Sequence, residues 1–132
     1  MAKERVKVFL LARAKEGLKQ TKELISKEGG KAEISITDLS KINSINEAIR
    51  KIKAKTNKID ILINVASIWH GKDEVYANRD FETFSQEIIL DTYTVGFTAP
   101  SLLAHAFIPL MPRGGKIINI SGTFESGAKG WL

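Results

Sequence analysis

The chain has 132 residues, of which 43% are hydrophobic and 27% are charged, a composition typical of one soluble globular domain spanning residues 1–132. It contains no cysteine, which excludes disulfides, thiolate metal sites and a cysteine nucleophile. The net charge of +5 comes from lysines mixed with polar residues at helical spacing, so we expect no nucleic-acid partner. No stretch is apolar enough for a membrane helix or a signal peptide, so we expect a cytoplasmic protein with no membrane partner.

The first half of the chain predicts two strands, each followed by a helix. Residues 6–12 form a short β-branched and apolar run, typical of a buried strand. Residues 15–28 carry apolar side chains at helical spacing and end at a Gly-Gly pair, which favours an amphipathic helix. A second strand is predicted over residues 32–36, and Ser40 is placed to cap a helix over residues 41–55.

The second half predicts a strand, a long helix and a further strand. The strongest strand pattern in the chain is at residues 59–65, and a polar loop follows it. Residues 81–111 are predicted to be helical, with a break near Gly96 or Pro100, and residues 116–121 form the fourth strand. Strands that alternate with helices in this way predict an α/β fold, with a parallel sheet covered by helices on both faces.

Five short motifs follow these elements in order. Leu11-Ala12-Arg13 closes the first strand, Asp38-Leu39 follows the second, and Asn64-Val65-Ala66-Ser67 closes the third. Residues 107–111 and 114–121 supply a helix end, a Gly-Gly turn and the fourth strand. In order and spacing they resemble the short-chain dehydrogenase/reductase family, whose Asn-Asn-Ala-Gly motif corresponds to the third of them.

The resemblance implies a three-layer Rossmann-like fold that binds NADP, or NAD, beyond the carboxyl ends of the strands. The guanidinium of Arg13 offers a planar fork of donors suited to a 2′-phosphate. Asp38 would accept a hydrogen bond from the adenine amino group while Leu39 packs on the ring. Small residues after the third strand would let the backbone approach the ribose, and Ile120 would lie under the nicotinamide. The expected cofactor-binding residues are Arg13, Asp38, Leu39, Asn64, Ala66, Ser67 and Ile120.

Simpler roles stay open for several of these residues. Arg13 is equally consistent with a surface arginine at a strand end, and Asp38 with the N-terminal cap of the following helix. Asn64 is also consistent with an asparagine that binds neighbouring backbone. With two histidines, no cysteine and no matching carboxylate spacing, we expect no metal site.

Other family motifs are missing from the sequence. In the family, a Gly-rich turn joins the first strand to the first helix, and this sequence has no such turn. Residues 1–4 resemble the end of that first helix, so the resemblance places the turn and the first strand upstream of residue 1. It places the catalytic Tyr-x-x-x-Lys pair beyond Leu132. The family's serine position is Gly122, which leaves Ser121 or Thr123 as weak substitutes. We therefore expect an internal fragment that binds the cofactor weakly or not at all and is inactive alone.

The missing strand is central in the family's sheet. We expect the sheet to close over the gap in the parallel order 32–36, 6–12, 59–65, 116–121, or another chain to supply the strand. The full protein would transfer hydride between the nicotinamide and a carbonyl or alcohol substrate, as a homo-oligomer. The alternative is a degenerate Rossmann fold kept as a non-enzymatic binding or oligomerisation module, which would have no affinity for NADP.

Overall fold

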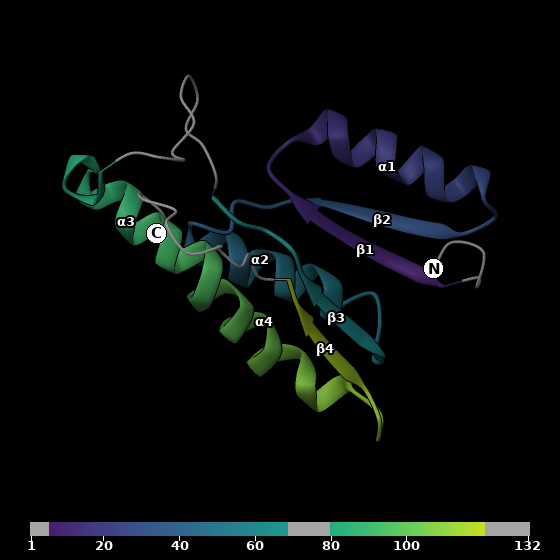
Figure 1. Ribbon diagram of the computed structural model, residues 1–132. Coiled ribbons are helices and arrows are strands. Elements are labelled where there is room, and N and C mark those ends of the chain that lie inside the picture. The colour runs from purple at the N-terminus through teal and green to yellow at the C-terminus, as the bar shows by residue number, and fades with distance from the viewer. Residues whose placement is uncertain (1–5, 69–79, 121–132) are drawn as a thin grey trace. The chain divides into compact units, whose positions relative to one another are not determined.

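The computed structural model describes residues 6–68 and 80–120 (Figure 1). The chain divides into two compact units, residues 1–57 and 58–132, and each contains a pair of strands with its helices. We describe the two units one at a time.

The first unit contains two parallel strands that alternate with two helices. Strand β1 pairs with β2 in a register that runs from Lys7 opposite Lys31 to Ala12 opposite Ile36. Helix α1 lies along this pair of strands, and its contacts are mainly with β2 (Figure 1). The four elements are β1 (Lys7–Ala12), α1 (Lys15–Lys27), β2 (Lys31–Ile36) and α2 (Ile42–Lys53), close to the predicted bounds.

Local sequence explains where these helices begin and end. Helix α1 ends at Gly29, whose φ of +78° is left-handed, and the N–H of Gly30 donates to the carbonyl of Ile25 at 2.9 Å. Helix α2 begins differently from the prediction. Its N-cap is Lys41, which makes no side-chain cap, so the expected capping role of Ser40 is wrong. The Ser40 hydroxyl binds Asp38 instead, because the chain turns there before the helix begins.

An ion cluster ties β2 to two other segments of the first unit. The carboxylate of Glu33 accepts from Lys7 on β1 at 2.8 Å and from Lys55, which follows α2. The hydrogen bonds from Lys55 and Lys7 lower the pKa of Glu33 from 4.5 to about 2. The Lys7 ammonium also lies 4.9 Å from the centre of the Phe9 ring. This cluster links β2 to β1 and to the segment after α2 on the face that carries Glu33, and solvent screens it because its lysines are exposed.

The pKa of Glu33 makes the stability of the first unit dependent on pH. Since its folded-state pKa of about 2 lies below the ordinary 4.5, the carboxylate stabilises the fold above pH 4.5, and this contribution is lost as pH falls toward 2. We expect Glu33→Gln to lower the thermal midpoint at pH 6 and to match the wild type near pH 2. Melting curves followed by circular dichroism would measure this difference. Wild-type and variant midpoints that stay the same distance apart over this range would contradict the proposed ion cluster.

The second unit contains a second parallel pair and a long interrupted helix. Strand β3 pairs with β4 from Ile61 opposite Lys116 to Asn64 opposite Asn119. The core of this unit consists of Phe84, Val95, Ala99, Leu103 and Phe107, all at most 8% exposed. Its elements are β3 (Ile61–Asn64), a 3-10 helix (Phe81–Thr83), α3 (Gln86–Tyr93), a π-helix (Thr94–Thr98), α4 (Ala99–Phe107), a 3-10 helix (Ile108–Leu110) and β4 (Lys116–Asn119).

The helix predicted over residues 81–111 begins later, at Gln86, because Phe84 and Ser85 are extended and the Ser85 hydroxyl caps α3. The interruption predicted near Gly96 or Pro100 is a π-helical turn, through which the helix continues. It spans Thr94–Thr98 and contains Gly96, while Pro100 lies in the first turn of α4, where its missing N–H costs little. Two hydroxyls near the turn donate to helix carbonyls. Thr92 donates to Ile88 at 2.7 Å and Thr94 donates to Leu90 at 2.8 Å.

The two outer pairings of the expected four-stranded order are confirmed. Residues 7–12 pair with 31–36 in the first unit, and residues 61–64 pair with 116–119 in the second, both in parallel. The expected central pairing joins β1 to β3, which belong to different units, so it stays a prediction.

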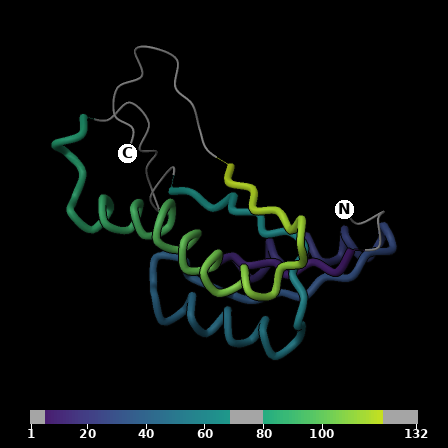
Figure 2. The backbone as a smooth tube through the Cα atoms, turned by 90° about the horizontal axis from the view of Figure 1, so that it is seen from below, coloured from purple at the N-terminus to yellow at the C-terminus, as the bar shows by residue number. Residues whose placement is uncertain are grey.

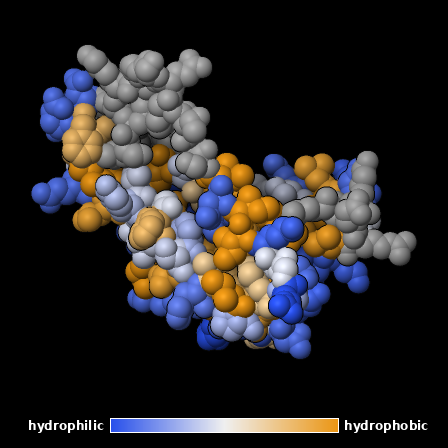
Figure 3. Space-filling view, turned by 60° about the horizontal axis from the view of Figure 1, so that its bottom comes forward, coloured by the Kyte–Doolittle hydropathy of each residue, from blue (hydrophilic) through white to orange (hydrophobic). Residues whose placement is uncertain are grey.

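One face of the β3–β4 pair exposes β-branched side chains. Ile63 lies opposite Ile118 in the register, and alternate residues of each strand point to the same side. The residues on this face, from 38% to 61% exposed, are Ile61, Ile63, Val65, Ile118 and Ile120. Figure 3 shows hydrophobic side chains interspersed with charged ones at the surface. None of the described helices is long and apolar enough to span a membrane.

Candidate cofactor-binding site

The first unit brings Arg13 and Asp38 to the same end of its two strands. The strands are parallel, and the N–H of Thr37 donates to the carbonyl of Ala12 at 2.9 Å, which extends the pairing to the carboxyl ends. Arg13 follows β1 directly and is exposed, while Asp38 lies two residues beyond β2 and is half-buried together with Leu39. The backbone path at this end can be followed in Figure 2. We call this arrangement of Arg13, Asp38 and Leu39 the first rim.

A hydrogen-bonded turn fixes the carboxylate of Asp38. Its Oδ1 accepts from the backbone N–H of Ser40 at 3.0 Å and from the Ser40 hydroxyl at 2.9 Å. The N–H of Asp38 donates to the Ser44 hydroxyl at 2.9 Å. Asp38 is therefore not the N-cap of α2, which is Lys41, so the alternative role considered for it is wrong. Sequence reasoning missed Ser40 and Ser44 as its partners, although the Asp-x-Ser spacing is a known turn signal.

The charge of Asp38 is stabilised at neutral pH. Partial burial acts to raise the pKa of its carboxyl group, but the two hydrogen bonds from Ser40 and the nearby charges of Arg13 and Lys41 outweigh it, and the pKa is lowered from its ordinary value. The group is thus an ionised acceptor with a positive guanidinium nearby. A ligand that offers a donor to the carboxylate and an anion to the guanidinium would match both charges.

The second unit brings Asn64 and Ile120 to the carboxyl ends of its own strands. The side-chain amide of Asn64 donates to Oδ1 of Asn119 at 2.8 Å, and the N–H of Ile120 donates to the Asn64 carbonyl at 2.8 Å. Sequence reasoning gave Asn119 no role. Both asparagines lie near the ends of the predicted strands, but only the register shows that they are neighbours.

The remaining predicted residues of the second unit follow β3. Ala66 and Ser67 are exposed, and Ile120 is 59% exposed. We call Asn64, Ala66, Ser67 and Ile120 the second rim. Ser121 and Thr123 lie outside the described residues. Because the rims belong to different units, their alignment along one cofactor stays a prediction. Within residues 6–68 and 80–120, no three histidine or carboxylate side chains are grouped so that they could hold a metal ion.

Comparison with known proteins points to one family. A family profile described as short chain dehydrogenase matches residues 1–130. Among curated proteins, the chain is 33% identical over 116 residues to a fatty acyl-CoA reductase of Acinetobacter baylyi and 30% identical over 132 residues to the ketoacyl reductase HetN of a Nostoc species. The matches cover 86% and 98% of this chain but 38% and 43% of those proteins, so it spans less than half of their length.

Solved structures agree with the profile. A metagenomic short-chain oxidoreductase, determined in complex with NADP, superimposes with a TM-score of 0.84 at 28% identity, over 98% of this chain and 57% of that one. A reductase of lugdunomycin biosynthesis, LugOII, gives a TM-score of 0.73 at 30% identity, over 91% of this chain and 50% of that one. These likenesses confirm the predicted Rossmann-like α/β fold.

Proposed function

Since this chain belongs to the short-chain dehydrogenase family, we propose that it is part of an NADP(H)-dependent oxidoreductase. The reaction is hydride transfer between the nicotinamide and the carbon of a carbonyl or alcohol substrate. The observation that carries the cofactor choice is the first rim, where a guanidinium and an ionised carboxylate lie at the ends of adjacent parallel strands. The compartment we propose is the cytoplasm, on the basis of the cysteine-free composition.

The first rim suits the adenosine half of NADP. Arg13 is exposed, so its guanidinium can bind the dianionic 2′-phosphate through two parallel hydrogen bonds. Asp38 can accept from the adenine amino group, and the turn through Ser40 holds it in place before the ligand arrives. Leu39 supplies apolar contact to the base. In this proposal the second rim serves the ribose and nicotinamide.

We further propose that these 132 residues do not carry out hydride transfer by themselves. The family's chemistry requires a Tyr-x-x-x-Lys pair, in which the tyrosine moves a proton and the lysine lowers its pKa. The two tyrosines of this sequence, Tyr76 and Tyr93, are followed four residues later by Asp80 and Phe97. When bound, the nicotinamide supplies or accepts the hydride, and the residues of this chain hold and orient the dinucleotide.

Calorimetric titration with nucleotides tests the proposed cofactor. We expect weak binding of NADP and of 2′,5′-ADP, at least tenfold tighter than of NAD and 5′-AMP respectively, because only NADP and 2′,5′-ADP present a 2′-phosphate to Arg13. Comparing 2′,5′-ADP with whole NADP separates the contribution of the first rim to binding from that of the rest of the site. Equal affinities within each pair would contradict the NADP assignment, and no binding of any nucleotide would favour the non-enzymatic module.

The proposal includes a homo-oligomer formed through the long helix of the second unit. Leu90, Tyr93 and Phe97 are 66%, 66% and 71% exposed, which is a large apolar surface for one helix. We expect sedimentation velocity to show a dimer or larger species that shifts toward the monomer in a Phe97→Ala variant. A monomeric wild type at tens of micromolar would contradict it.

A further inference from the structure

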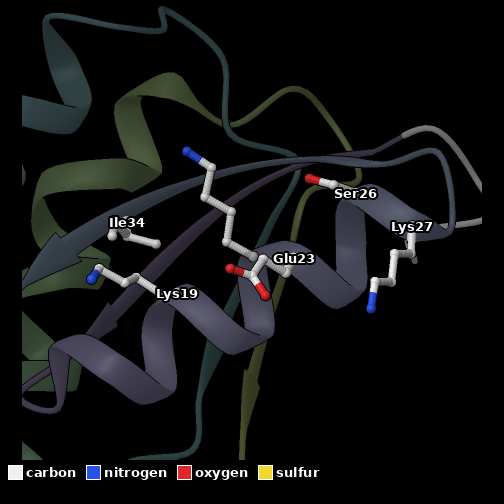
Figure 4. A pocket seen from close by; sticks show the side chains of 6 residues that line it. Lys19, Glu23, Ser26, Lys27 and Ile34 are labelled. Atoms are coloured by element: carbon white, nitrogen blue, oxygen red, sulfur yellow. The ribbon is translucent and has the colours of Figure 1, made fainter.

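An open groove lies between α1 and β2 in the first unit, and none of the proposed cofactor-binding residues lines it. Its volume is about 510 Å³. Figure 4 shows Lys19 beside Ile34 at one end and Lys27 at the other, along one side of α1. The lining residues are Lys19, Lys22, Glu23, Ser26, Lys27 and Ile34. We call this the α1–β2 groove.

The α1–β2 groove has an excess of positive charge that the described residues 6–57 of this unit do not pair. It is lined by three lysines and one carboxylate. Lys19 binds Glu16 at 3.0 Å, but Lys22 and Lys27 make no ion pair with any residue in the described segments. The opposite face of β2 differs, because Glu33 there is matched by two lysines. Carboxylates from another molecule would neutralise the positive charge of the groove.

The backbone edge of β2 that faces away from β1 is also open. Within the described residues β2 pairs with β1 alone, and the N–H of Thr37 points to Ala12 of that strand. Backbone groups of successive residues point to opposite edges, so those of Ala32, Ile34 and Ile36 face the free edge. Ile34 therefore offers its side chain to the groove and its backbone groups to an incoming strand.

We propose that the α1–β2 groove binds an extended acidic segment of a partner protein, which adds as a strand beside β2. Its backbone would pair with the free edge, its carboxylates would bind Lys22 and Lys27, and an apolar side chain would pack on Ile34. Strand addition of this kind obtains affinity from the backbone and selectivity from alternate side chains. A nucleic acid would use the lysines but neither the strand edge nor the isoleucine, so the combination favours a peptide.

Fluorescence anisotropy with a labelled eight-residue peptide, Glu-Thr-Val-Thr-Glu-Thr-Glu-Thr, tests this proposal on the full chain, because its alternate residues place both Glu and Val on the face toward the groove. We expect saturable binding, at least tenfold weaker in the double variant Lys22→Glu/Lys27→Gln. A peptide with Lys in place of Glu should not bind. An acidic peptide with N-methyl groups on alternate residues should bind at least tenfold more weakly, because its methylated nitrogens cannot donate hydrogen bonds to the carbonyls at the free edge of β2.

The matched control is Arg50→Gln/Lys53→Glu, which removes the same charge from the last turn of α2. It should bind the acidic peptide as the wild type does. No binding by the wild type, equal weakening in the control, or full affinity of the N-methylated peptide would each overturn the proposal. So would stronger binding of single-stranded RNA or anionic vesicles that displaces the peptide. The groove variant should leave NADP titration unchanged, which keeps this test separate from the proposed oxidoreductase role.

Discussion

Replacing Phe107 with alanine is expected to lower the free energy of unfolding by about 3–5 kcal/mol. The side chain is 3% exposed at the end of α4, in a core that also contains Leu103 and Ala99. Its removal costs the transfer free energy of the lost ring and leaves a cavity among these buried side chains. Urea unfolding followed by circular dichroism measures the change.

A second phenylalanine on the same long helix supplies the control. Phe97 is 71% exposed, so Phe97→Ala should change the free energy of unfolding by less than about 0.5 kcal/mol when both variants are measured at a concentration low enough for the chain to be monomeric. The pair of variants removes the same atoms from a buried and an exposed position. If both lost stability to the same extent, the assignment of the core face of this helix would be wrong.

Arg13→Ala is expected to weaken NADP binding about 10- to 100-fold and to leave NAD binding unchanged. The reason is that a charge-assisted hydrogen bond contributes about 1.5–3 kcal/mol, and only NADP carries the phosphate that uses it. Calorimetry with both nucleotides measures the difference, and Arg50→Ala on α2 removes a similar charge elsewhere in the first unit. Equal losses for the two nucleotides in Arg13→Ala would argue for a general structural role.

The elements of the fold could be predicted because their patterns are local. The Gly-Gly pair ends α1 near the predicted residue, since Gly29 adopts a positive φ that other residues disfavour. The interruption of the long helix near Gly96 was also predictable from the sequence. The N-cap of α2 was not, because the Ser40 hydroxyl binds Asp38 in a turn and does not cap the helix. The pairing of β1 with β3 stays a prediction, because these strands belong to different units.

The sequence was enough to place the residues of the candidate site along the chain, but not to show which side chains contact them. Arg13 and Asp38 follow strands and Asn64 ends one, so periodicity is enough to place them at strand ends. The partners that fix them, Ser44 and Asn119, lie 6 and 55 residues away in sequence, and only the turn and the strand register bring them close. Ser121 and Thr123 stay predictions, because they lie outside the described residues.

The π-helical turn at Thr94–Thr98 has a consequence for alignment. A π-turn holds one residue more than the α-turn it replaces, and each residue of an α-helix advances the chain by about 100° around the axis. Deleting Gly96 would therefore rotate α3 by about that angle with respect to α4, and the side chains that precede the deletion would change faces. An alignment with any relative that lacks the extra residue needs a one-residue gap inside this helix. Without that gap, every helix position before the turn is aligned with a residue on a different face of the relative's helix.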